Sequence, residues 1–74
     1  MTIHEAAGIV ERVGLDVPYY RSEGREWVIG LDDTAVRVPD LLTVAVDALK
    51  QAGLHPATIR QDVAVGRWEL VISV

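Results

Sequence analysis

The chain has 74 residues, of which 50% are hydrophobic and 24% charged, and its formal net charge is −4. This length allows one domain, residues 1–74, and the composition is typical of a folded chain rather than a disordered one. Cysteine is absent, which excludes a disulfide framework and a thiolate metal site. The negative charge argues against nucleic acid or an anionic membrane as a partner.

Segments that would target or anchor the chain are not evident. No apolar run approaches the roughly 18 residues that suggest a membrane span, and the first residues lack the basic region of a signal peptide. We therefore expect a cytoplasmic protein, or a virion component if the chain is phage-encoded. Arginine outnumbers lysine by six to one, a bias common in GC-rich genomes such as those of actinobacteria and their phages.

The first predicted element is an amphipathic helix over residues 3–13. Thr2 and Glu5 form a capping-box pattern, in which each side chain satisfies a backbone N–H at the helix start. Apolar residues recur at helical spacing along one face, and Gly14 can take the left-handed conformation that ends a helix.

A hairpin is expected next, with strands at residues 19–21 and 26–31 around a turn at 22–24. Trp27, Ile29 and Leu31 share one face of the second strand, whereas Val28 and Gly30 share the other. Residues 35–38 form either a third short strand or an extended lead-in to the next helix.

A second helix is predicted from about Pro39 to Gly53. Its polar residues occupy a narrow stripe, and the apolar remainder divides into a bulky seam and a small-residue seam. These seams are Leu42, Val46 and Leu49, and Leu41, Ala45, Ala48 and Ala52. Because a helix that lies on a sheet needs one apolar face, we expect the second seam to pack on the first helix or on another subunit.

The last predicted element is a second hairpin with its turn at Gly66. Ile59 lies on the opposite face from Arg60 in its first strand. In its second strand, Trp68 begins an apolar alternation, and Val71 is the exception on the polar face.

The order helix, hairpin, helix, hairpin resembles a ferredoxin-like plan whose first strand has moved to the end, a circular permutation. It predicts an α+β two-layer sandwich, in which a four-stranded antiparallel sheet carries two helices on one face. The second strand of each hairpin would be central, with Trp27 and Trp68 turned toward the helices. The halves share Gly-Leu, Pro and Arg/Trp positions, which reflect either duplication or shared architecture without ancestry.

Residues with catalytic chemistry are sparse. His4 and His55 sit near helix ends, where a solvated or capping role is favoured over a metal or acid–base role. Asp32 and Asp33 have a composition typical of turns rather than the spacing of a cation site. We therefore expect no cofactor, no metal and no enzymatic activity.

The leading functional hypothesis is a small protein-interaction module: an accessory subunit, an inhibitor or a particle component. It would form a homo-oligomer, most simply a dimer, or dock on a protein partner. The alternatives are a small-molecule-sensing domain of ferredoxin-like type and a cofactor-independent small enzyme. The interaction residues are predicted from the apolar excess of the second helix, the open sheet face and a Tyr–Arg pair; they are Leu42, Val46, Leu49, Val28, Val71, Tyr20 and Arg21.

Overall fold

A computed structural model describes residues 1–32, 38–62 and 67–73 of the chain. It has the predicted element order, with two helices and two hairpins. The elements are α1 (Ile3–Val13), β1 (Tyr19–Glu23), β2 (Glu26–Asp32), α2 (Val38–Gln51), β3 (His55–Asp62) and β4 (Arg67–Ser73). The predicted α+β class is therefore confirmed.

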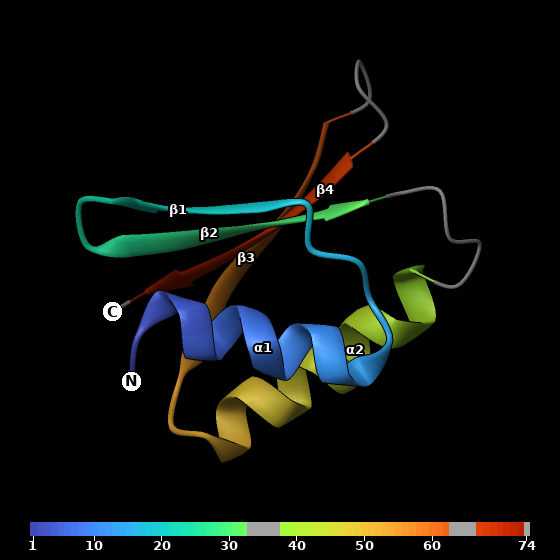
Figure 1. Cartoon of the computed structure of the whole chain (residues 1–74), viewed down its shortest axis with the longest axis horizontal. Helices are drawn as coiled ribbons and strands as arrows, with labels where there is room; N and C mark the ends of the chain where they lie inside the picture. The colour runs from blue at the N-terminus through green and yellow to red at the C-terminus, as the bar shows by residue number, and fades with distance from the viewer. Residues whose placement is uncertain (33–37, 63–66, 74) are drawn as a thin grey trace.

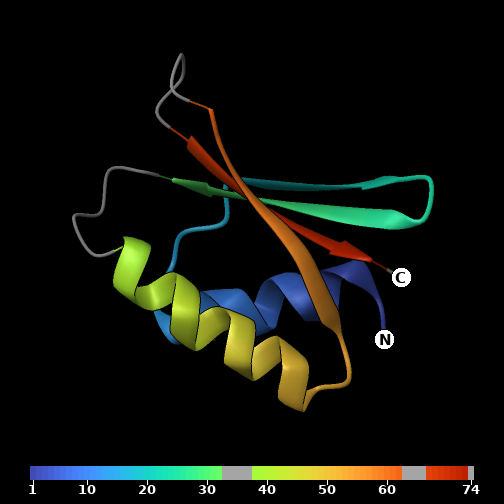
Figure 2. The same cartoon turned by 180° about the vertical axis from the view of Figure 1, so that it is seen from behind.

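The four strands form one antiparallel sheet in the order β1-β2-β4-β3. This is the order that the permuted plan requires, and it makes the second strand of each hairpin central. Both helices lie on the same face of the sheet, so that the other face has no helix over it (Figures 1 and 2). The strands of Trp27 and Trp68 are neighbours, as predicted.

Local signals at the start and end of α1 act as the sequence indicates. The Thr2 hydroxyl accepts a hydrogen bond from the backbone N–H of Glu5, and the Glu5 carboxylate accepts one from the N–H of Thr2. Gly14 ends the helix with a φ of 113°, in the left-handed region that favours glycine.

The hydrophobic core lies between the helices and the inner face of the sheet. Alternate residues of the two central strands point into it, and Trp27 and Trp68 pack against its rim, half-buried. Its buried members are Ala6, Val10, Leu15, Ile29, Leu31, Leu42, Ala45, Leu49, Leu54, Leu70 and Ile72. Both tryptophans therefore face the helices, as predicted.

Three details of the second half refine the prediction. The small-residue side of α2 approaches α1, where a Cβ placed on Gly14 would lie 3.9 Å from Leu41 Cδ1. Strand β3 begins at His55, and its register shifts between Pro56 and Thr58. Of the strand or lead-in predicted at residues 35–38, Val38 begins α2, and the other residues lie outside the described residues, as does the turn at Gly66. In the part of the chain that is described, no helix is long and apolar enough to cross a membrane.

Candidate functional site

Two valines are buried on the sheet face that carries no helix. Val28 and Val71 are direct cross-strand partners on β2 and β4, and they are only 0% and 4% exposed. Their chain neighbours Ile29 and Leu70 point to the helices, so the valines point away from them. Side chains of the sheet itself must therefore cover this face.

The cover begins with a tyrosine that lies flat against a glycine. Tyr19 on β1 is the cross-strand partner of Gly30 on β2, and a Cβ at position 30 would overlap the Tyr19 ring. The guanidinium carbons of Arg21 and Arg67 each lie 5.7 Å from the centre of that ring, within the range of a cation–π contact. Arg21 is also the direct cross-strand neighbour of Val28. Long side chains with apolar stems therefore line the space above the valines.

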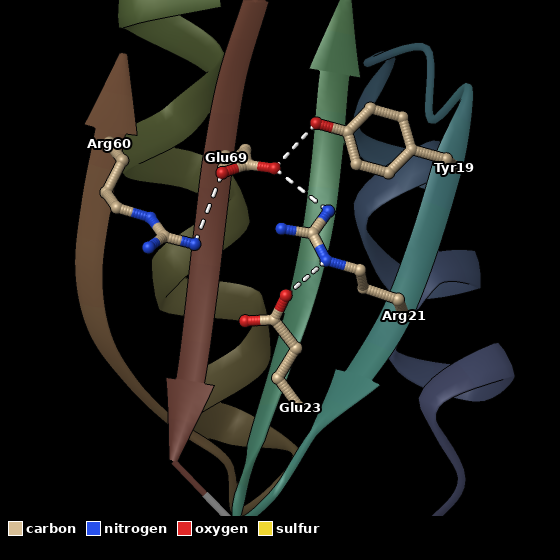
Figure 3. A network of polar contacts seen from close by, with 5 residues as sticks. All are labelled: Tyr19, Arg21, Glu23, Arg60 and Glu69. Atoms are coloured by element: carbon tan, nitrogen blue, oxygen red, sulfur yellow. Dashed lines mark hydrogen bonds and ion pairs between the residues drawn. The ribbon is translucent and has the colours of Figure 1, made fainter. Parts of the chain in front are cut away.

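Glu69 on β4 joins these side chains across the sheet (Figure 3). Its Oε2 atom accepts a hydrogen bond of 2.7 Å from the Tyr19 hydroxyl and one of 3.1 Å from Arg21. Its Oε1 atom forms an ion pair with Arg60 on β3 at 3.2 Å. Arg21 also donates a 2.6 Å hydrogen bond to Glu23. We call these five residues the clasp, because they connect β1, β4 and β3 over β2.

The clasp fixes the protonation states of its two central groups. Burial, and then the hydrogen bond to the Glu69 carboxylate, raise the pKa of Tyr19. The hydrogen bond from Tyr19, and then that from Arg21, outweigh burial and lower the pKa of Glu69. The pKa of Arg21 is raised, first by its hydrogen bond to Glu23. Near neutral pH the clasp therefore holds a neutral tyrosine against an ionised carboxylate, an arrangement that fastens the strands together.

The structure corrects the expectation that the predicted interaction residues form open apolar surface. Leu42 and Leu49 are buried in the core. Val28 and Val71 are buried on the opposite face of the sheet, which carries the clasp. Val46 is half-buried against the core. The bulky seam of α2 is thus the one that packs on the sheet, and the small-residue seam faces α1.

Tyr20 and Arg21 do not form one contact surface, because neighbouring residues of a strand point to opposite faces. Arg21 belongs to the clasp, whereas Tyr20 lies on the helix side. There the Tyr20 hydroxyl is 3.0 Å from Nδ1 of His4 on α1, and the residue remains 41% exposed. The aromatic residue that contacts the Arg21 side chain is Tyr19, which was not among the predicted interaction residues.

An apolar groove lies at the β3 edge of the sheet, between that strand and α2. It has a volume of about 460 Å³ and an apolar floor with polar residues on the helix rim. Ile59, on β3, is 44% exposed beside it. The groove is lined by Leu42, Thr43, Val46, Asp47, Lys50, Ile59 and Trp68. Of the predicted interaction residues, it brings together Leu42 and Val46; Ile59 and Trp68 were not predicted as site residues.

Within the described residues, no group of three or more His, Asp or Glu side chains is placed to hold a metal ion. No model of a known protein family matches the chain, and no curated protein matches it.

The contact between Tyr19 and Gly30 predicts that the effect of Gly30→Ala on the free energy of unfolding depends on whether the Tyr19 ring is present. Gly30→Ala should lower the free energy of unfolding by about 1–3 kcal/mol, because the new methyl group displaces the ring. In a Tyr19→Ala background the same change should be neutral or stabilising, since alanine is preferred to glycine within a strand by roughly 0.5–1 kcal/mol. Urea unfolding followed by tryptophan fluorescence measures both values.

Gly8→Ala is the matched control, because a Cβ there meets nothing within 4 Å. It lies inside α1, where alanine is favoured over glycine by about 1 kcal/mol, so this change should stabilise the protein in either background. An equal cost of Gly30→Ala with and without the tyrosine ring would show that the ring does not occupy that space.

The lowered pKa of Glu69 predicts how the clasp responds to acid. Because this pKa is lower in the folded protein than its ordinary value of about 4.5, the stabilisation is fully present above that pH. It is lost as the pH falls through the folded pKa. Glu69→Gln should cost about 1–3 kcal/mol at neutral pH, and the difference from wild type should shrink steadily below about pH 4.5. Urea unfolding at a series of pH values tests this.

Glu11→Gln serves as the control, since Glu11 is an exposed carboxylate on α1 outside the clasp. We expect it to change the free energy of unfolding by less than about 0.5 kcal/mol. A gap between wild type and Glu69→Gln that stays constant from neutral to acid pH would argue against a stabilising carboxylate at the centre of the clasp.

Proposed function

We propose that this chain is a small, non-enzymatic protein-interaction module that works through the β3 edge of its sheet, by self-association or by docking on a protein partner. The observation that carries the proposal is the combination of an edge strand with an adjoining apolar groove, where Ile59 is 44% exposed. An edge strand presents backbone N–H and C=O groups that another strand can pair with.

The two edge strands, β1 and β3, differ in how many of their residues already make contacts within the chain. Strand β1 has five residues, and its Tyr19, Arg21 and Glu23 side chains are engaged in the clasp. Strand β3 has eight residues and, in the described sheet, pairs with β4 alone. Its register shift at Pro56 and Thr58 leaves residues 58–62 as the regular part of the edge. This comparison favours β3 as the edge that receives a partner.

The groove supplies what a bare edge lacks, a means of selecting the partner. Its floor includes the indole of Trp68, and large aromatic groups are enriched among the residues that dominate binding energy. Asp47 and Lys50 on the rim of α2 carry opposite charges, and charged rims favour a complementary partner over others. Main-chain pairing would give affinity and the groove would give specificity.

Ile59→Asp should abolish binding by this surface while leaving the fold intact, because the side chain is exposed and the new charge would be desolvated on binding. Purified chain is first examined by sedimentation. Immobilised chain is then used to capture proteins from an extract of the cells that encode it, with wild type and variant compared. Wild type should associate, with itself or with a captured protein, at least tenfold more than Ile59→Asp.

Val44→Asp is the matched control. Val44 is an exposed apolar residue of α2, 52% accessible, that does not line the groove, so its replacement should leave association unchanged. A wild-type chain that is monomeric at micromolar concentration and retains no protein beyond what Ile59→Asp retains would overturn the proposed function.

A further inference from the structure

We infer that the β3 edge and its groove receive a second copy of this chain, related by a two-fold axis that passes beside Ile59. This inference rests on the proposed function and names the occupant of the same surface. Two observations support a copy rather than an unrelated chain: an exposed apolar residue, Ile59, in the regular part of the edge strand, and the opposite charges on the rim of α2.

The pairing register of the two β3 strands can be chosen by comparing the side chains that each position of the two-fold axis would set opposite one another. Two β3 strands related by a two-fold axis run antiparallel, and opposing residues lie on the same face of the joined sheet. An axis at Arg60 would set two guanidinium groups opposite each other, which is unfavourable. An axis at Ile59 sets two exposed apolar side chains together and places Thr58 opposite Arg60 of the other copy. The chemistry of the edge therefore favours Ile59.

The same axis brings the charges of α2 into complementary positions. Asp47 and Lys50 lie one helical turn apart on the rim of the groove, and both are exposed. Among the residues that the structure describes, neither has an ion-pair partner in its own chain. Asp47, Lys50 and Ile59 line the same groove. A two-fold axis reverses the direction of the second α2, and with the axis level with the helical turn between residues 47 and 50, Asp47 of one copy comes opposite Lys50 of the other, twice in each dimer.

The dimensions of the elements are compatible with this arrangement. Paired strands lie about 4.8 Å apart, and α2 lies beneath the β3 side of the sheet (Figure 2). Joining two β3 strands therefore brings the two α2 helices toward each other on the same face of the joined sheet. The apolar floors of the two grooves would then face each other, and one sheet of eight strands would result.

Charge balance also favours a copy at this surface over a copy elsewhere. Each chain carries a net charge of −4, so two copies repel each other in general. On the groove rim, one positive and one negative charge offset each other, and the positive charge of Arg60 on β3 is already paired with Glu69. The β3 edge is thus a surface on which two acidic chains can meet without opposing like charges.

Cysteine cross-linking tests the register directly, because the natural chain has no cysteine. Opposing residues in an antiparallel pair have Cα atoms about 4.5–5.5 Å apart, within the separation that a disulfide requires. The Ile59→Cys variant should therefore form a covalent dimer under mild oxidation, reversibly on reduction. It should do so at least tenfold faster than Val44→Cys at the same micromolar concentration. Equal rates for the two variants would overturn the inference.

A charge exchange tests the helix contact independently. Asp47→Lys and Lys50→Glu, each alone, should raise the dissociation constant of the dimer roughly 3- to 30-fold, because two ion pairs become repulsive contacts. The double variant should return to within about twofold of wild type. Sedimentation measures association, and circular dichroism verifies that each monomer remains folded. Single and double variants that associate equally would contradict the antiparallel helix contact.

The outcomes separate this inference from the function on which it rests. A dimer that depends on Ile59 and obeys the charge exchange supports both. A monomer whose edge captures another protein in an Ile59-dependent way overturns the second copy as occupant and leaves the interaction function standing. A monomer that captures nothing overturns both. A dimer that is indifferent to Ile59 overturns the site in both proposals.

Discussion

The contact of the Tyr19 ring with Gly30 determines how a sheet with helices on one side can bury residues on the other. Only a residue without a Cβ lets the ring lie against β2, and the ring in turn brings its hydroxyl to Glu69. Arg21, Arg60 and Glu23 are then arranged around that carboxylate. Val28 and Val71 are shielded as a result, which gives this face part of the burial that a third layer would otherwise supply.

The clasp stabilises the sheet through geometry more than through the strength of any single ion pair. Arg21 and Arg60 are largely exposed, where an isolated pair contributes only about 0–1 kcal/mol. Glu69 is different, because its side chain is only 16% exposed. It accepts hydrogen bonds from residues of β1 and forms an ion pair with a residue of β3 at the same time. A half-buried carboxylate needs such partners. The network therefore links the two edge strands, β1 and β3, to the central strand β4.

Local patterns were enough to predict most of the fold, whereas contacts between distant residues were not. Thr2 and Glu5 interact within the first turn of α1, and Gly14 ends the helix locally. The alternation that begins at Trp68 indicates which side of the strand faces the core. Such features can be predicted from the sequence because they depend on residues close together in the chain. The clasp depends on residues up to 50 positions apart, and the sequence does not show which residues meet across strands. Within β2, a glycine at position 30 interrupts a run of residues that favour strands. This was the local feature of the sequence that pointed to the clasp. The two seams of α2 could likewise be recognised, but not assigned to their neighbours.

The covered face and the open edge are physically connected, because Arg60 belongs to both. It sits next to Ile59 on β3, and its ion pair with Glu69 holds the edge strand to the centre of the sheet while offsetting a charge that would face a partner. A core of this size supplies only about 3–5 kcal/mol, so burial of the β3 edge against the proposed partner would add substantially to stability. With the clasp over the helix-free face, the β3 edge and its groove still carry exposed apolar surface, including Ile59 at 44%. Arg60 therefore links the cover of the helix-free face to the edge at which we propose association.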